Sequence, residues 1–151
     1  MIMRRLLRSL VLWVFGGTMY FLLEVGWKMA QGHPNEISWT MLVLAAMICI
    51  PLDQVNEHPS RNMPLWLQAV LGGMGITAAE LVAGLVLNVW LGLGIWDYSN
   101  SSINLCGQIC LTFALMWVPV AGAGIVMFAW LRYWLYGERR PEYVFWRRKH
   151  E

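Results

Sequence analysis

Long apolar runs alternate with short polar stretches along this chain of 151 residues. The first run covers residues 6–27, and a helix of that length measures about 33 Å, which is enough to cross a bilayer. The second run, residues 37–52, would measure about 24 Å, which is short for a span. Apolar residues also dominate 65–95, and 98–131 contains no charged residue. The pattern therefore predicts four transmembrane helices.

The polar stretches between these runs have the composition of loops. Residues 53–64 are the most polar, and residues 96–104 are rich in serine and asparagine. As a single helix, residues 98–131 would measure about 51 Å, which is more than the thickness of a bilayer core. We expect Pro119 to kink or end this helix, so that the residues after it extend into the cytoplasm or lie in the membrane interface.

The predicted fold is all-α: a polytopic membrane helix bundle of four transmembrane helices with a kinked or interfacial C-terminal helix. Residues 1–136 form the transmembrane domain, and residues 137–151 form a basic and aromatic cytoplasmic tail. The composition agrees, because 58% of the residues are apolar and only 13% are charged. These values argue against a disordered chain and against a soluble enzyme domain. All three cysteines lie in apolar runs and are predicted to be buried: Cys49, Cys106 and Cys110.

The basic residues predict the orientation of the bundle. With four spans and both termini inside, ten of the eleven Lys and Arg residues lie on the inner side and Lys28 alone lies outside. A fifth span after Pro119 would leave four inside and place seven outside. The positive-inside rule favours the first arrangement. We therefore expect a protein of the bacterial cytoplasmic (inner) membrane with both termini in the cytoplasm and an uncleaved first helix.

Two glutamates, Glu24 and Glu80, lie within apolar runs. A carboxylate at the centre of a spanning helix costs about 2.5–3.5 kcal/mol on insertion scales, so each is a candidate for function. For Glu80 the alternative is a packing role, and for Glu24 it is half-solvation or pairing with Lys28. Each glutamate follows a glycine pair by the same spacing (Gly16-Gly17 and Gly72-Gly73). The equal spacing indicates either a parallel internal repeat or a chance similarity between the two segments.

Further polar residues follow Glu80 along the chain. Gly84 and Asn88 continue from Glu80 in steps of four, so the three share one helix face. Asp97 lies in a loop between Trp96 and Tyr98. It could cap the following segment or hold the loop while the two aromatic residues anchor the loop at the membrane surface, or it could form part of a substrate entrance. Asn104 and Gln108 form an i, i+4 pair that we place at the start of the last helix, where interhelical hydrogen bonding is the alternative role. The predicted polar intramembrane site comprises Glu24, Glu80, Asn88, Asp97, Asn104 and Gln108.

The C-terminal part of the chain is basic and aromatic. Its position beside a membrane favours contact with lipid head groups over nucleic acid. The residues predicted to contact lipid or the interface are Arg132, Arg139, Arg140, Arg147, Arg148 and Lys149. The three histidines show no metal-binding spacing, and the sequence has no P-loop and no nucleophile motif. We therefore expect no catalytic residue, no metal and no cofactor, and a protein that is not itself an enzyme.

An ordered set of motifs lies between residues 72 and 143. It consists of Glu80-x3-Gly84-x3-Asn88, Trp96-Asp97-Tyr98-Ser99, Asn104-x2-Gly107-Gln108-Ile109-Cys110-Leu111, Trp117, and Leu131-Arg132-Tyr133 with Gly137-Glu138 and Pro141-x-Tyr143. With this set, the chain resembles a bacterial family of small integral membrane proteins, the type IV ABC-transporter or CmpB-like permeases. The resemblance implies transport, but it supplies no substrate and no catalytic residue.

The leading hypothesis is thus a transporter or permease component with a polar intramembrane site. Because four helices make a thin bundle, we expect a homo-oligomer or a separate membrane subunit. An ABC-type role requires an ATPase supplied in trans, docked on residues 53–64 or on the tail. The alternative is a non-transport protein, namely a structural, assembly or regulatory membrane subunit or a phage-type lysis factor, in which the polar residues only join helices.

Overall fold

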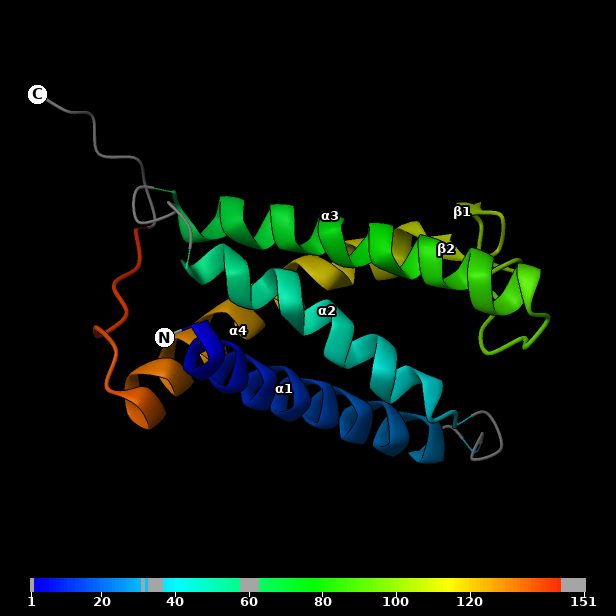
Figure 1. Cartoon of the computed structure of the whole chain (residues 1–151). Coiled ribbons are helices and arrows are strands. Elements are labelled where there is room, and N and C mark those ends of the chain that lie inside the picture. The colour runs from blue at the N-terminus through cyan, green and yellow to red at the C-terminus, as the bar shows by residue number, and fades with distance from the viewer. Residues whose placement is uncertain (1, 31, 33–36, 58–62, 145–151) are drawn as a thin grey trace, which may run out of the picture.

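The computed structural model describes residues 2–30, 32, 37–57 and 63–144. Four long helices account for most of this part of the chain, and a two-stranded antiparallel hairpin precedes the last of them (Figure 1). The elements are α1 (Ile2–Ala30), α2 (Thr40–Glu57), α3 (Leu65–Gly84), a π-helical segment η3 (Leu85–Trp90), β1 (Asn104–Leu105), β2 (Ile109–Cys110) and α4 (Leu111–Tyr136). The predicted all-α fold is therefore confirmed.

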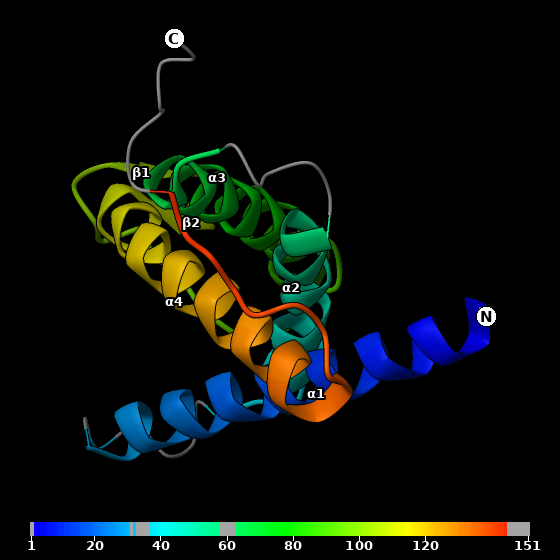
Figure 2. The same ribbon diagram turned by 90° about the vertical axis from the view of Figure 1, so that its left-hand side faces the viewer.

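The helices form two hairpins, α1 with α2 and α3 with α4, which lie against each other (Figures 1 and 2). Glycine permits the close approach within each hairpin. A Cβ atom on Gly17 would lie 2.7 Å from the backbone nitrogen of Ala46, and one on Gly73 would lie 3.0 Å from that of Val118. The second glycine of each pair seen in the sequence thus has the same role in its hairpin.

Three of the helical segments are long and apolar enough to cross a membrane: Leu6–Ala30, Leu65–Trp90 and Leu111–Tyr136. The apolar part of α2, Thr40–Ile50, is shorter. Many large apolar side chains point away from the bundle, for example Leu23 at 70% and Leu115 at 63% exposure. Such surfaces suit contact with lipid tails rather than water. The structure is therefore that of a membrane protein with three candidate spans, and a fourth span remains a prediction.

The boundaries of two helices differ from those expected. Residues 53–57 continue α2 rather than opening a loop, because the Asp53 carboxylate is buried and paired inside the bundle. The last helix begins at Leu111, so the residues before it form a separate loop and hairpin. From this later start, α4 passes through Pro119 without ending and reaches Tyr136. Its 26 residues give about 39 Å, which a tilted helix can accommodate.

The residues after α4 turn back along the bundle. Gly137 ends the helix with a left-handed backbone conformation (φ 64°), and its N–H bonds to the Tyr133 carbonyl. The following segment runs beside α4 toward the start of α3 (Figure 2). There the backbone N–H of Leu65 donates to the carbonyl of Val144 over 2.8 Å. The first residues of the predicted tail are thus held against the helices.

Candidate functional site

Glu80 lies at the point where α3, α4 and the loop between them converge. Its side chain is buried in the bundle, although it belongs to one of the three candidate spans. The Tyr98 hydroxyl donates to Oε1 over 3.1 Å, and the Trp117 indole Nε1 donates to Oε2 over 2.9 Å. Both carboxylate oxygens therefore have a partner, and both of these partners are uncharged.

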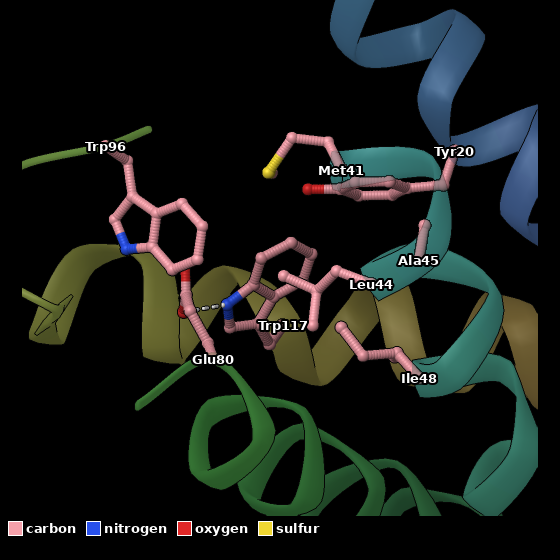
Figure 3. A pocket seen from close by; sticks show the side chains of 8 residues that line it. All are labelled: Tyr20, Met41, Leu44, Ala45, Ile48, Glu80, Trp96 and Trp117. Carbon is pink, nitrogen blue, oxygen red and sulfur yellow. Dashed lines mark hydrogen bonds between the residues drawn. The ribbon is translucent and has the colours of Figure 1, made fainter. Parts of the chain in front are cut away.

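A small cavity of about 20 Å³ adjoins this carboxylate (Figure 3). Four aromatic or sulfur-containing side chains face it together with aliphatic ones. The cavity is lined by Tyr20, Met41, Leu44, Ala45, Ile48, Glu80, Trp96 and Trp117. The rings of Tyr20 and Trp117 are in contact, with centroids 5.7 Å apart. Among these described lining residues Glu80 is the only ionisable acid and none is basic. The result is an aromatic cavity with one carboxylate in its wall.

Asn88 and Gln108 hold the loop that brings Trp96 to this cavity. The Asn88 amide donates to the Trp96 carbonyl over 3.0 Å and to Gln108 Oε1 over 2.9 Å. Its oxygen accepts from the backbone N–H of Ile95 over 2.7 Å. The Trp96 indole in turn donates to the Gln108 carbonyl over 3.0 Å. Gly84 makes room for this arrangement, since a Cβ there would lie 2.5 Å from Gln108 Oε1.

Asp97 and Asn104 shape the rest of the same loop. Asp97 accepts hydrogen bonds from both the backbone and the hydroxyl of Ser99, and these bonds lower the pKa of its exposed carboxyl group. Asn104 accepts from the backbone N–H of Gly107 over 3.0 Å, and the carbonyl of Gly107 accepts from Tyr98 over 2.8 Å. Gly107 has a φ of 69°, a conformation that suits glycine. These contacts fix the backbone of Tyr98, whose hydroxyl reaches Glu80.

The predicted site residues therefore do come together, but in two different roles. Glu80 faces the cavity, whereas Asn88, Asp97, Asn104 and Gln108 bond mainly to the loop backbone and position its aromatic residues. The expected helical pair of Asn104 and Gln108 is wrong, because both precede α4: Asn104 lies in β1, and Gln108 in the turn before β2. Cys106 is also exposed rather than buried and has a positive φ of 54°, whereas Cys49 and Cys110 are buried.

Glu24 lies near the cavity and pairs with Lys28. Its Oε1 is 3.1 Å from the Lys28 ammonium, which is the pairing considered from the sequence. Its Oε2 is buried and accepts no hydrogen bond from any residue that the structure describes. The Glu24 carboxylate also interacts electrostatically with Glu80 and with Tyr20. A second acid thus lies near the aromatic cavity, and its charge is balanced by Lys28.

The sequence prediction missed the aromatic lining of the site. Tyr20 is four residues before Glu24, so the i, i+4 spacing could have placed both on one face of α1. Trp96 and Tyr98 flank Asp97 in the sequence, but they were predicted to anchor the loop at the membrane surface. Nothing in the local sequence indicated that Trp117 would donate to Glu80 from 37 positions away.

A second polar cluster joins α1, α2 and α4 near the other end of the bundle. Arg132 and Asp53 form a bidentate ion pair, with Nε–Oδ1 and Nη2–Oδ2 distances of 2.8 and 2.7 Å. The Trp13 indole also donates to Asp53 over 3.0 Å, and Arg132 reaches Ser9 and Glu138. Arg132 was expected to contact lipid, but it is only 5% exposed because the Asp53 carboxylate holds it inside the bundle.

The remaining basic residues of the predicted lipid surface have different positions. Arg139 and Arg140 are exposed, and the Arg140 guanidinium lies 5.9 Å from the centre of the Trp130 ring. Arg147, Arg148 and Lys149 lie outside the described residues. Within the described ranges, no three His, Cys, Asp or Glu side chains are grouped as a metal site would require.

Comparison with known proteins gives one match. A family model described as "Putative ABC-transporter type IV" matches residues 4–140. The match confirms the resemblance noted in the sequence, and it extends over both helical hairpins rather than over residues 72–143 alone. No curated protein and no solved structure matches the chain.

Proposed function

The chain belongs to the type IV ABC-transporter family, and on that premise we propose that it is the membrane-spanning permease component of a bacterial transporter. Glu80 and the aromatic side chains around it form its substrate site in this proposal. The observation that carries it is the environment of Glu80: a buried carboxylate in an apolar helix, bonded to two uncharged donors and open to a cavity.

The chemistry of these contacts favours a working site over a packing contact. Keeping a carboxylate inside a membrane bundle is costly, and neutral polar groups can join helices at lower cost. Asn88 and Gln108 already join α3 to the loop in that way. If Glu80 served only to connect Tyr98 and Trp117, its negative charge would contribute little to the stability of the bundle. Binding of a cationic or protonated substrate group in the cavity would explain why an acid occupies position 80 and why it lies beside that cavity.

The proposal includes a separate ATPase and an assembly of more than one membrane subunit. The sequence has no P-loop of its own, so a partner would supply ATP hydrolysis. We place both termini and residues 53–64 on the cytoplasmic side of the inner membrane, following the basic residues. The part of the tail beyond Val144, which lies outside the described residues, is a second candidate for docking the partner. The exposed Arg139 and Arg140 would contact anionic lipid there.

The first test is affinity purification of the tagged full-length protein in mild detergent, followed by mass spectrometry. We expect an ATPase at stoichiometric level together with further copies of the chain. A preparation that contains only this chain and lipid would contradict the ABC-type role and favour a structural or regulatory membrane subunit.

The second test compares Glu80→Gln with Glu142→Gln in the purified complex reconstituted in liposomes. Glu142 is exposed and lies outside the cavity, so it controls for the loss of one carboxylate. We expect the Glu80 variant to insert and assemble normally but to lose at least tenfold of its transport-coupled ATP hydrolysis. If that variant instead fails to fold or assemble, Glu80 has a packing role.

A further inference from the structure

We propose that the Glu80 cavity binds a small ammonium-type cation, either the ammonium ion or the head group of a short primary amine. This inference rests on the proposed function, because it takes Glu80 as the substrate site and names the chemical class of the substrate. Three properties of the cavity point to it: the charge of its wall, the nature of its surfaces and its size.

The wall carries a negative charge when the Glu80 carboxylate is ionised. The two donors to the Glu80 carboxylate, Tyr98 and Trp117, are both neutral. The described lining contains no Lys, Arg or His. The nearby Lys28 is paired with Glu24, so that pair contributes no net positive charge. The described partners of the Glu80 carboxylate are neutral. A cation in the cavity would therefore be its oppositely charged partner.

The surfaces favour an ammonium group over a metal ion. Tyr20, Trp96 and Trp117 present aromatic rings, which attract cations through their negative faces. Met41 adds a polarisable thioether, and the remaining lining residues are aliphatic (Figure 3). Calcium and magnesium ions require about six or more oxygen ligands, whereas the described side chains of the lining offer only the Glu80 carboxylate and the Tyr20 hydroxyl.

Hydrogen bonding is compatible with an ammonium group in this place. An ionised carboxylate has about four lone-pair positions, and the two printed donors to Glu80 use one on each oxygen. Each oxygen can therefore accept another N–H. A potassium ion has a similar charge and size but donates no hydrogen bond, so the same carboxylate would distinguish the two.

The size of the cavity limits the ligand further. Its volume of about 20 Å³ admits one water-sized species. Ammonium and the –NH3 end of a short amine meet this limit, whereas a tetra-alkylammonium group exceeds it. The aromatic walls therefore select by charge, and the small volume selects by size.

The test measures equilibrium binding of radiolabelled methylammonium to the purified full-length protein in detergent by scintillation proximity. We expect saturable binding that unlabelled ammonium displaces, and that tetramethylammonium and potassium at the same concentration do not. Glu80→Gln should weaken binding at least tenfold, whereas the control Glu142→Gln should leave it within twofold of the wild type.

Two variants of Tyr20 test the proposal independently if Glu80→Gln does not fold. Tyr20→Phe retains the aromatic ring, and Tyr20→Leu replaces it with an aliphatic chain. We expect binding to fall severalfold in the leucine variant and to stay near the wild-type value in the phenylalanine variant. Equal binding in the two variants would overturn the role of the aromatic wall.

Other results would overturn the ligand class itself. These are an absence of saturable binding, displacement by potassium as effective as displacement by ammonium, or unchanged binding in a folded Glu80→Gln variant. Co-purification of an ATPase without methylammonium binding would overturn the ligand class and leave the proposed transporter role intact. Binding without an ATPase would support the ligand class and contradict the ABC-type role.

Discussion

Asp53 and Glu80, the buried carboxylates in the described part of this bundle, share one contact and differ in another. Each accepts a hydrogen bond from a tryptophan indole, Asp53 from Trp13 over 3.0 Å and Glu80 from Trp117 over 2.9 Å. Asp53 also receives the Arg132 guanidinium, whereas Glu80 receives the neutral Tyr98 hydroxyl. The first carboxylate is therefore neutralised within the chain, and the second is not neutralised by the partners described for it.

The same chemical group is thus held by an opposite charge in one place and by neutral donors in the other. A buried ion pair satisfies both charges and fixes the helices that carry them. A buried carboxylate with neutral partners keeps the capacity to bind a positive group. Along α4, Trp117 and Arg132 are 15 positions apart, about 22 Å. The two clusters are thus separated by most of the thickness of a bilayer core.

The largest loss of stability is expected when the ion pair between Asp53 and Arg132 is broken. Arg132→Met leaves the Asp53 carboxylate buried without its ion-pair partner, and we expect a loss of about 3–5 kcal/mol in the free energy of unfolding. Denaturation of the purified protein in detergent, followed by circular dichroism, measures it. Arg139→Met, at an exposed position, is the control and should change little. Equal stability of the two variants would contradict the structural role of the Asp53–Arg132 pair.

A smaller effect is expected where α3 meets α4. Gly73→Ala places a Cβ 2.9–3.0 Å from Val118, so the two helices must separate slightly. We expect a loss of about 1–3 kcal/mol together with weaker contact between Trp117 and Glu80. Gly75→Ala is the matched control, because a Cβ there meets nothing within 4 Å. The comparison of unfolding midpoints tests this, and similar midpoints would mean that the close approach at Gly73 contributes nothing to stability.

The fold should tolerate loss of the charge on Glu80, whose described partners are neutral. Glu80→Gln keeps the shape of the side chain but leaves one of the donors, Tyr98 or Trp117, without a good acceptor. We expect a cost of about 1–2 kcal/mol, clearly below that of Arg132→Met, while ligand binding is lost. The same denaturation assay gives the free energy of unfolding of both variants. A loss at Glu80 as large as that at Arg132 would mean that both carboxylates are structural.

The smallest effect concerns the loop that places Tyr98 beside Glu80. The hydrogen bonds from Ser99 hold the pKa of Asp97 below its usual value of 3.8. The ionised form therefore stabilises the loop at pH values above about 3.8, and this contribution is lost as the pH falls through the lowered pKa. The protection factors of the loop amides, which compare each exchange rate with the intrinsic rate at the same pH, should therefore fall as the pH falls over that range. Asp97→Asn should abolish the pH dependence, and a dependence that persists in this variant would exclude Asp97 as its source.

The elements that could be predicted from the sequence are those set by local composition. The apolar runs that became α1, α3 and α4 are visible because a spanning helix requires a long apolar segment. The helical state of Asp53 could not be predicted, because it depends on Arg132, 79 positions later. In the same way, Glu80 stood out as an acid in an apolar helix, but the aromatic walls of its cavity form only after the loop folds back onto α3.

The Asp53–Arg132 pair also implies an order of events during biosynthesis. The two residues are separated by 79 positions, so at a synthesis rate of 5–20 residues per second roughly 4–16 s pass between their appearances. Until Arg132 emerges from the ribosome, Asp53 lacks the ion pair that it forms in the finished bundle, and burying its carboxylate is costly. We therefore expect the α1–α2 hairpin to reach its final depth only after the last helix has been made. On this view, membrane insertion finishes when the four helices pack together.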